Sequence, residues 1–112
     1  MGLIQIELNP ATRGDFTYRP AAHHVNVGDP VQFELTAPAG GVYTIAFYDG
    51  SAMRDPHGQS VVGIETTSGS TPTYRAGPSP GVYHYAVAAA YRDPSGSVRV
   101  FLDAYCPTII VH

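Results

Sequence analysis

Apolar residues alternate with polar or small residues along most of the chain, with a period of two. Ile4, Ile6 and Leu8, for example, would share one face of a first strand. Glycine or proline interrupts the pattern at short intervals, and no stretch keeps apolar residues at helical spacing. The alternation therefore predicts strands, which we place at residues 4–8, 25–27, 31–35, 42–48, 60–65, 73–75, 82–91, 97–103 and 108–112.

Short strands that follow one another with turns between them are typical of two sheets packed over one core. We expect an all-β fold, a single antiparallel Greek-key β-sandwich of about 8 to 9 strands. A chain of 112 residues has the size of one ordinary domain, so the sandwich would span residues 1–112. The alanines at positions 88–90 are the only helix-like patch, and they lie inside a run rich in tyrosine and valine.

Two segments are repeated along the chain. Residues 38–43 (Pro-Ala-Gly-Gly-Val-Tyr) are echoed at 78–83 (Pro-Ser-Pro-Gly-Val-Tyr), and residues 54–58 (Arg-Asp-Pro-His-Gly) are echoed at 92–96 (Arg-Asp-Pro-Ser-Gly). This order of elements predicts two similar hairpins, at residues 41–65 and 81–103.

Each hairpin tip carries Asp, Pro and Gly at the first, second and fourth places of a type I turn. If both hairpins enter from the same end of the sandwich, the two tips project side by side. Arginine makes bidentate contacts to carboxylates and stacks on aromatic rings, so it is a good anchor at a protein interface. We therefore expect the interaction residues to be Arg54, Asp55, His57, Tyr91, Arg92 and Asp93.

Charge is sparse. Only 13% of the residues are charged, where about 25% is usual, and the six cations besides histidine are all arginine. A net charge of -3 argues against binding to nucleic acid and to anionic membranes, both of which require basic patches. Low charge density promotes association. Eight tyrosines without a tryptophan suggest either an interface surface or aromatic covers for the open ends of the sandwich.

The first eight residues have no basic region, no long apolar run and no small-residue cleavage site, so they indicate a strand and not a signal peptide. The single cysteine, Cys106, has no internal disulfide partner. As written, the chain is expected to be cytoplasmic, or secreted or periplasmic if a leader was removed.

Three segments together resemble the cupredoxin framework. They are residues 25–33 (Val-Asn-Val-Gly-Asp-Pro-Val-Gln-Phe), the Gly-x-Tyr-x-Tyr strand that starts at Gly81, and the closing residues 108–111. The resemblance implies a cupredoxin-like β-sandwich. Immunoglobulin-like sandwiches use the same Gly-x-Tyr-x-Tyr pattern, and that alternative stays open.

The blue-copper ligand set of that family does not carry over. Such a site needs a thiolate, two imidazoles and a weak axial ligand, usually methionine. In the family the thiolate closes the Tyr-x-Tyr strand, but here Val87, Ala88 and Ala89 hold that place and no methionine follows Met53. Copper or zinc could instead be held by histidines from different strands. For this alternative the candidate ligands are His24, His84 and His112.

Catalysis has little support in the sequence. Pro107 follows Cys106 directly and no helix is expected beside it, so we expect a buried, unreactive thiol. No nucleophile elbow, phosphate-binding loop or dinucleotide fingerprint is present. Asp29, Asp55 and Asp93 are explained as turn formers. The chain is therefore not expected to be an enzyme and is expected to need no cofactor.

The sequence favours a non-catalytic interaction or assembly module that binds a protein partner or a second copy of itself. The first alternative is a histidine-based copper or zinc domain of cupredoxin-like type. The second is a small glycan-binding module that uses exposed tyrosines.

Overall fold

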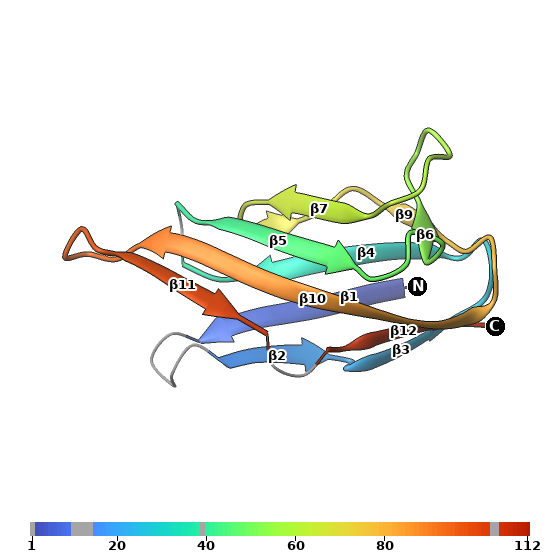
Figure 1. Ribbon diagram of the computed structural model, residues 1–112, viewed down its shortest axis with the longest axis horizontal. Coiled ribbons are helices and arrows are strands. Elements are labelled where there is room, and N and C mark those ends of the chain that lie inside the picture. Colours follow the sequence, from blue (N-terminus) through green and yellow to red (C-terminus); the bar gives the residue numbers. More distant parts are fainter. Residues whose placement is uncertain (1, 10–14, 39, 104–105) are drawn as a thin grey trace.

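The computed structural model describes residues 2–9, 15–38, 40–103 and 106–112, and these residues form two β-sheets with no helix (Figure 1). Each sheet contains six strand segments. The predicted all-β class is confirmed. The twelve segments exceed the predicted number, because three of them, β2, β6 and β8, had not been expected as strands.

The first sheet has the strand order β2-β1-β4-β9-β6, and β8 pairs with β4 beside this path. The strand bounds are β1 Gly2–Asn9, β2 Asp15–Arg19, β4 Pro30–Thr36, β6 Met53–Arg54, β8 Gly69–Ser70 and β9 Tyr74–Ala76.

The second sheet has the order β3-β12-β10-β5-β7, and β11 pairs with the C-terminal half of β10. Its bounds are β3 Ala22–Val25, β5 Val42–Phe47, β7 Gly63–Thr66, β10 Gly81–Arg92, β11 Val98–Leu102 and β12 Thr108–Val111. β11 and β12 both run antiparallel to β10 and lie one after the other along it.

Both sheets are mixed, so the expectation of purely antiparallel pairing is wrong. β1 pairs with β4 in parallel, and β12 pairs with β3 in parallel. The cause is the path of the chain from one sheet to the other. β2 runs antiparallel to β1 in the first sheet, β3 follows it in the second sheet, and the turn at residues 26–29 then reverses the chain and returns it beside β1 as β4.

The core lies between the two sheets and contains inward-facing residues of both. Phe33 of β4 meets Tyr85 of β10 edge-on at 5.7 Å and Phe47 of β5 at 6.2 Å between ring centroids. Most of the described tyrosines belong to this core and are at most 9% exposed: Tyr43, Tyr74, Tyr83, Tyr85 and Tyr91. The interpretation of the tyrosines as a contact surface is therefore wrong for these five, which supply apolar area to the core.

The repeated Gly-Val-Tyr segments have a structural explanation. Tyr43 points inward and its hydroxyl donates to the carbonyl of Pro38 at 2.6 Å, while Tyr83 donates to the carbonyl of Ser79 at the same distance. Residue 39 of the repeat lies outside the described residues. In each copy the tyrosine folds back over the glycine two residues before it, so that a Cβ on Gly41 would lie 2.7 Å from the Tyr43 hydroxyl.

The two tips share one turn design, as predicted. The Gly58 amide donates to the Asp55 carbonyl and the Gly96 amide to the Asp93 carbonyl, both at 2.9 Å. Both glycines have positive φ, which L side chains rarely adopt.

The tips do not project side by side, however. β5 and β10 are antiparallel neighbours, with Phe47 opposite Tyr85, so the chain leaves the two strands at opposite ends of the sheet. Figure 1 shows the loop after β6 and the β10–β11 tip at opposite ends of a molecule that measures 45 × 25 × 23 Å.

Candidate interaction surface

The outward face of the second sheet is apolar across three neighbouring strands. On β11, the residues Val98, Val100 and Leu102 are 60%, 63% and 75% exposed. They lie opposite Arg92, Ala90 and Ala88 of β10. We use the name apolar face for the outward residues Val42, Thr44 and Ala46 of β5, Ala86, Ala88 and Ala90 of β10, and Val98, Val100 and Leu102 of β11.

Small side chains at the centre of this face leave it hollowed. The alanines of β10 lie between the larger residues of β11 and those of β5. A shallow hollow of about 250 Å³ opens between Leu102, Ala88 and Ala46, and a second of about 130 Å³ opens between Val100, Ala90 and Val42. The face is therefore a shallow apolar trough along β10.

The trough also borders an open strand edge. The Asp103 amide donates to the Val87 carbonyl and the Asp93 amide to the Ser97 carbonyl, both at 2.9 Å. Because backbone groups alternate in direction along a strand, Arg99 and Phe101 also turn their amide and carbonyl groups toward β10. Val98, Val100 and Leu102 turn theirs away, toward an edge on which no strand of the described residues pairs.

At the first predicted tip, the side chains of Asp55 and Arg54 form hydrogen bonds within the loop itself. The carboxylate of Asp55 accepts from the amides of His57 and Gln59 at 2.8 and 2.9 Å. Arg54 donates to the Gly50 carbonyl at 3.1 Å and to the Ser60 hydroxyl at 2.7 Å. Of the three residues predicted at this tip, His57 is exposed, while Arg54 and Asp55 are partly buried.

The second predicted tip repeats this arrangement. Asp93 accepts from the amides of Ser95 and Ser97, both at 3.0 Å, and from the Ser95 hydroxyl at 2.6 Å. The Ser95 hydroxyl bond is the main cause that lowers the pKa of Asp93. Arg92 donates to the Gly96 carbonyl at 2.6 Å. Tyr91 is only 7% exposed and stacks on Phe101 with ring centroids 5.9 Å apart, so little of its side chain is open to a partner.

Two of the three predicted metal ligands meet. His24 on β3 and His112 after β12 approach with Nδ1 of the first 2.9 Å from Nε2 of the second, and their ring planes differ by 12°. His84 lies opposite Thr108, four residues before His112, which is about 13 Å along β12. The structure thus brings together a pair and not the trio. No group of three or more histidine, cysteine, aspartate or glutamate side chains gathers among the residues it describes.

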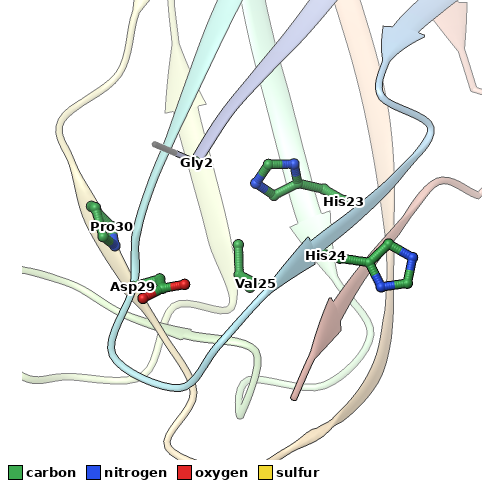
Figure 2. A pocket seen from close by; sticks show the side chains of 6 residues that line it. All are labelled: Gly2, His23, His24, Val25, Asp29 and Pro30. Atoms are coloured by element: carbon green, nitrogen blue, oxygen red, sulfur yellow. The ribbon is translucent and has the colours of Figure 1, made fainter.

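His23 and His24 point to opposite sides of β3, as expected for neighbours in a strand (Figure 2). His23 faces inward beside Gly2 and helps to line a hollow of about 210 Å³ together with Asp29 and Pro30. Burial, and then the nearby His24, lower the pKa of His23, which favours its neutral form.

Cys106 is exposed, so the expectation of a buried thiol is wrong. Its backbone has a φ of 49°, outside the strand that begins at Thr108, and its amide donates to the Asp103 carboxylate at 3.0 Å. The sulfur lies 3.5 Å from the hydroxyl of Tyr48, which is 68% exposed. That hydrogen bond is the first cause that raises the pKa of Tyr48.

Sequence reasoning did not name the apolar face, although a signal for it was present. In the strand that became β10, the aromatic residues Tyr83, Tyr85 and Tyr91 occupy alternate positions and go to the core. The alternation therefore assigns the even-numbered alanines, Ala86, Ala88 and Ala90, to the outside, and β11 has its own apolar row at the even positions. A strand that is apolar on both faces is a candidate for burial on both sides.

Comparison of the chain with models of known protein families, with curated proteins and with solved structures finds no match. Among the residues that the structure describes, no helix is long and apolar enough to cross a membrane.

Proposed function

We propose that the protein is a non-catalytic interaction or assembly module, and that its contact surface is the apolar face of the second sheet. The observation that carries this proposal is the row Val98, Val100 and Leu102, each at least 60% exposed on one strand. Isolated exposed apolar residues are ordinary in soluble proteins, whereas a contiguous apolar patch marks an interaction site.

Covering the face would be favourable. Burial of an exposed valine or leucine side chain is worth about 1.5 to 3 kcal/mol, so these three residues and Val42 together offer several kcal/mol. Within the apolar face there is no ionisable side chain, so a partner would bury no charge there. The nearest charged neighbours stand at its margin: Glu65 opposite Thr44, Arg92 opposite Val98, and Asp103, which follows Leu102 and lines the larger hollow.

The test compares Val42→Lys on the apolar face with Val82→Lys at the other end of the same sheet. The two valines are 51% and 59% exposed, so both variants should fold. Self-association is measured by sedimentation velocity, and binding of a different protein by retention on the immobilised chain. We expect Val42→Lys to weaken association and Val82→Lys to leave it unchanged. Association that is absent, or equal in all three proteins, would contradict the proposal.

A second candidate function is binding of copper or zinc by His24 and His112. The specific observation in its favour is the 2.9 Å approach of two imidazole nitrogens at the surface. Imidazole is a good ligand for both metals, although two histidines leave the remaining coordination positions to water or to another molecule. Titration with each metal should raise the melting temperature of the wild type and of His84→Ala, but not of His24→Ala. Equal shifts in all three proteins would remove this candidate.

For the fold we propose a Greek-key sandwich of cupredoxin-like type, with an immunoglobulin-like sandwich as the alternative. In support, residues 25–33 supply the end of β3, the turn after it and the start of β4, and the other two segments lie in β10 and β12. An experimental structure tests the strand order directly.

A further inference from the structure

The edge of β11 unites two properties in the same three residues. Val98, Val100 and Leu102 turn their backbone amide and carbonyl groups toward the open edge, and their side chains lie on the apolar face. An edge of this kind is a template for an added strand, because each unpaired backbone group can bond to one of another chain.

The other edges carry the features by which proteins block such pairing. β2 ends in the charged residue Arg19, and Pro20 follows it. β6 and β8 have two residues each, and β3 and β7 have four each, with Glu65 in β7. Short strands, charges and proline all discourage edge-to-edge contact. β11 has five residues, no proline and a single charge, Arg99.

We infer that β11 pairs antiparallel with β11 of a second copy of this chain, centred on Val100. This inference rests on the proposed interaction role and adds the partner and the register. Val100 then lies opposite Val100 of the second copy, and Val98 opposite its Leu102. The two apolar faces join into one, because a twofold axis through the Val100 pair keeps both on the same side of the joined sheet.

Charge supports this register. Arg99 would lie opposite Phe101 of the second copy, so the two Arg99 side chains do not face each other. Within one chain the Arg99 guanidinium already lies over the Phe101 ring, 5.1 Å from its centroid, and this register leaves that contact in place. A register centred on Arg99 itself would place like charges directly opposite, which is destabilising.

The first experiment uses Val100→Pro in the full chain. The Val100 amide faces the open edge, so proline removes no bond to β10 and should be tolerated there. It does remove both hydrogen bonds of the central pair between copies. We expect the dimer dissociation constant from sedimentation velocity to rise at least about tenfold. Val100→Thr, which keeps the amide, should dimerise nearly as the wild type does.

The second experiment reads the register and does not depend on proline. In a Cys106→Ser background, one cysteine is placed at position 98, 100 or 102, and disulfide-linked dimers are measured after mild oxidation. Only position 100 lies opposite itself, while the copies of positions 98 and 102 would be about 13 Å apart, too far for a disulfide. We expect crosslinking of Val100→Cys alone. Equal crosslinking at all three positions, or a wild type that stays monomeric at submillimolar concentration, would overturn the inference.

The same measurements separate this inference from the proposed function. A dimer that survives Val100→Pro and is lost in Val42→Lys would keep the apolar face as the contact surface and refute strand pairing. A dimer lost in Val100→Pro and unchanged in Val42→Lys would keep strand pairing and show that Val42, two strands away from the paired edge, takes no part in the dimer. A chain that associates with nothing contradicts both.

Discussion

Tyr83 and Tyr85 lie two residues apart on β10 and point into the same core, yet only the hydroxyl of Tyr83 has a hydrogen-bond acceptor in the part of the chain that the structure describes. Tyr83 donates to the Ser79 carbonyl at 2.6 Å, whereas the Tyr85 hydroxyl is buried without a partner and the Tyr85 ring packs against Phe33 and Phe47. Burial, and then the charge of Asp103, raise the pKa of Tyr85, which keeps it neutral in the core.

This difference predicts opposite results for one substitution at the two positions. Tyr83→Phe should lower the free energy of unfolding by about 1 kcal/mol, because a hydrogen bond is lost. Tyr85→Phe should leave it unchanged or raise it by up to about 1 kcal/mol, because a buried polar group without a partner is removed. Urea denaturation of the two variants checks this, and a larger loss for Tyr85→Phe than for Tyr83→Phe would show the assignment to be wrong.

Gly41 and Gly81, each two residues before a tyrosine of the repeat, predict a second contrast. A Cβ on Gly41 would lie 2.7 Å from the Tyr43 hydroxyl and 2.9 Å from the Tyr91 Cβ, whereas on Gly81 it would lie 3.3 Å from the Tyr83 ring. Gly41→Ala should therefore cost about 1 to 3 kcal/mol of overpacking, and Gly81→Ala less than about 1 kcal/mol. Thermal unfolding of both variants measures the difference. Equal losses would mean that the Tyr43 ring moves away at little cost.

The tip arginines predict a third contrast. Arg54 joins the Gly50 carbonyl to the Ser60 hydroxyl, while Arg92 bonds to its own exposed turn. Arg54→Ala should lower the free energy of unfolding by about 1 kcal/mol, and Arg92→Ala by a few tenths. If both variants keep the wild-type stability but lose association, the tips are contact sites as the sequence suggested.

The Asp93 carboxylate predicts a dependence on pH. Its pKa in the folded chain lies below the ordinary value of 3.8. The ionised Asp93 carboxylate therefore stabilises the fold at every pH above 3.8, and this stabilisation is lost as the pH falls through the lower pKa of the folded chain. Asp93→Asn should have a lower free energy of unfolding than the wild type at neutral pH. The difference between the two free energies should shrink as the pH falls from about 5 to 2. Glu65→Gln is the control for the loss of one negative charge. A stability difference between Asp93→Asn and the wild type that does not change with pH would contradict the prediction.

Much of the fold was readable from the alternation of residue types. The strands around Ile4, Phe33, Ile45 and Tyr85 follow from period two, since each buries one face, and both Asp-Pro-x-Gly turns formed as their residue types require. β2 was missed because Phe16 and Tyr18 give only two alternations between charged residues. β6 and β8 have two residues each, too few for any periodicity.

The candidate sites depended on relations that no local pattern contains. Sequence reasoning proposed the tips and the histidines, whereas the apolar face became visible only once Val100 was seen opposite Ala90 and Ala90 opposite Val42. Each of these residues alone is an ordinary exposed apolar side chain.

The sequence by itself determined the all-β class, the inward row of each main strand and the two turns, because local sterics and period-two burial act within a few residues. Only the tertiary structure decided that β1 runs parallel to β4, that the tips lie at opposite ends, and that His24 meets His112 while His84 does not. These outcomes depend on which strands become neighbours. Packing of the whole core decides that, and the core is built by residues that lie far apart in the sequence.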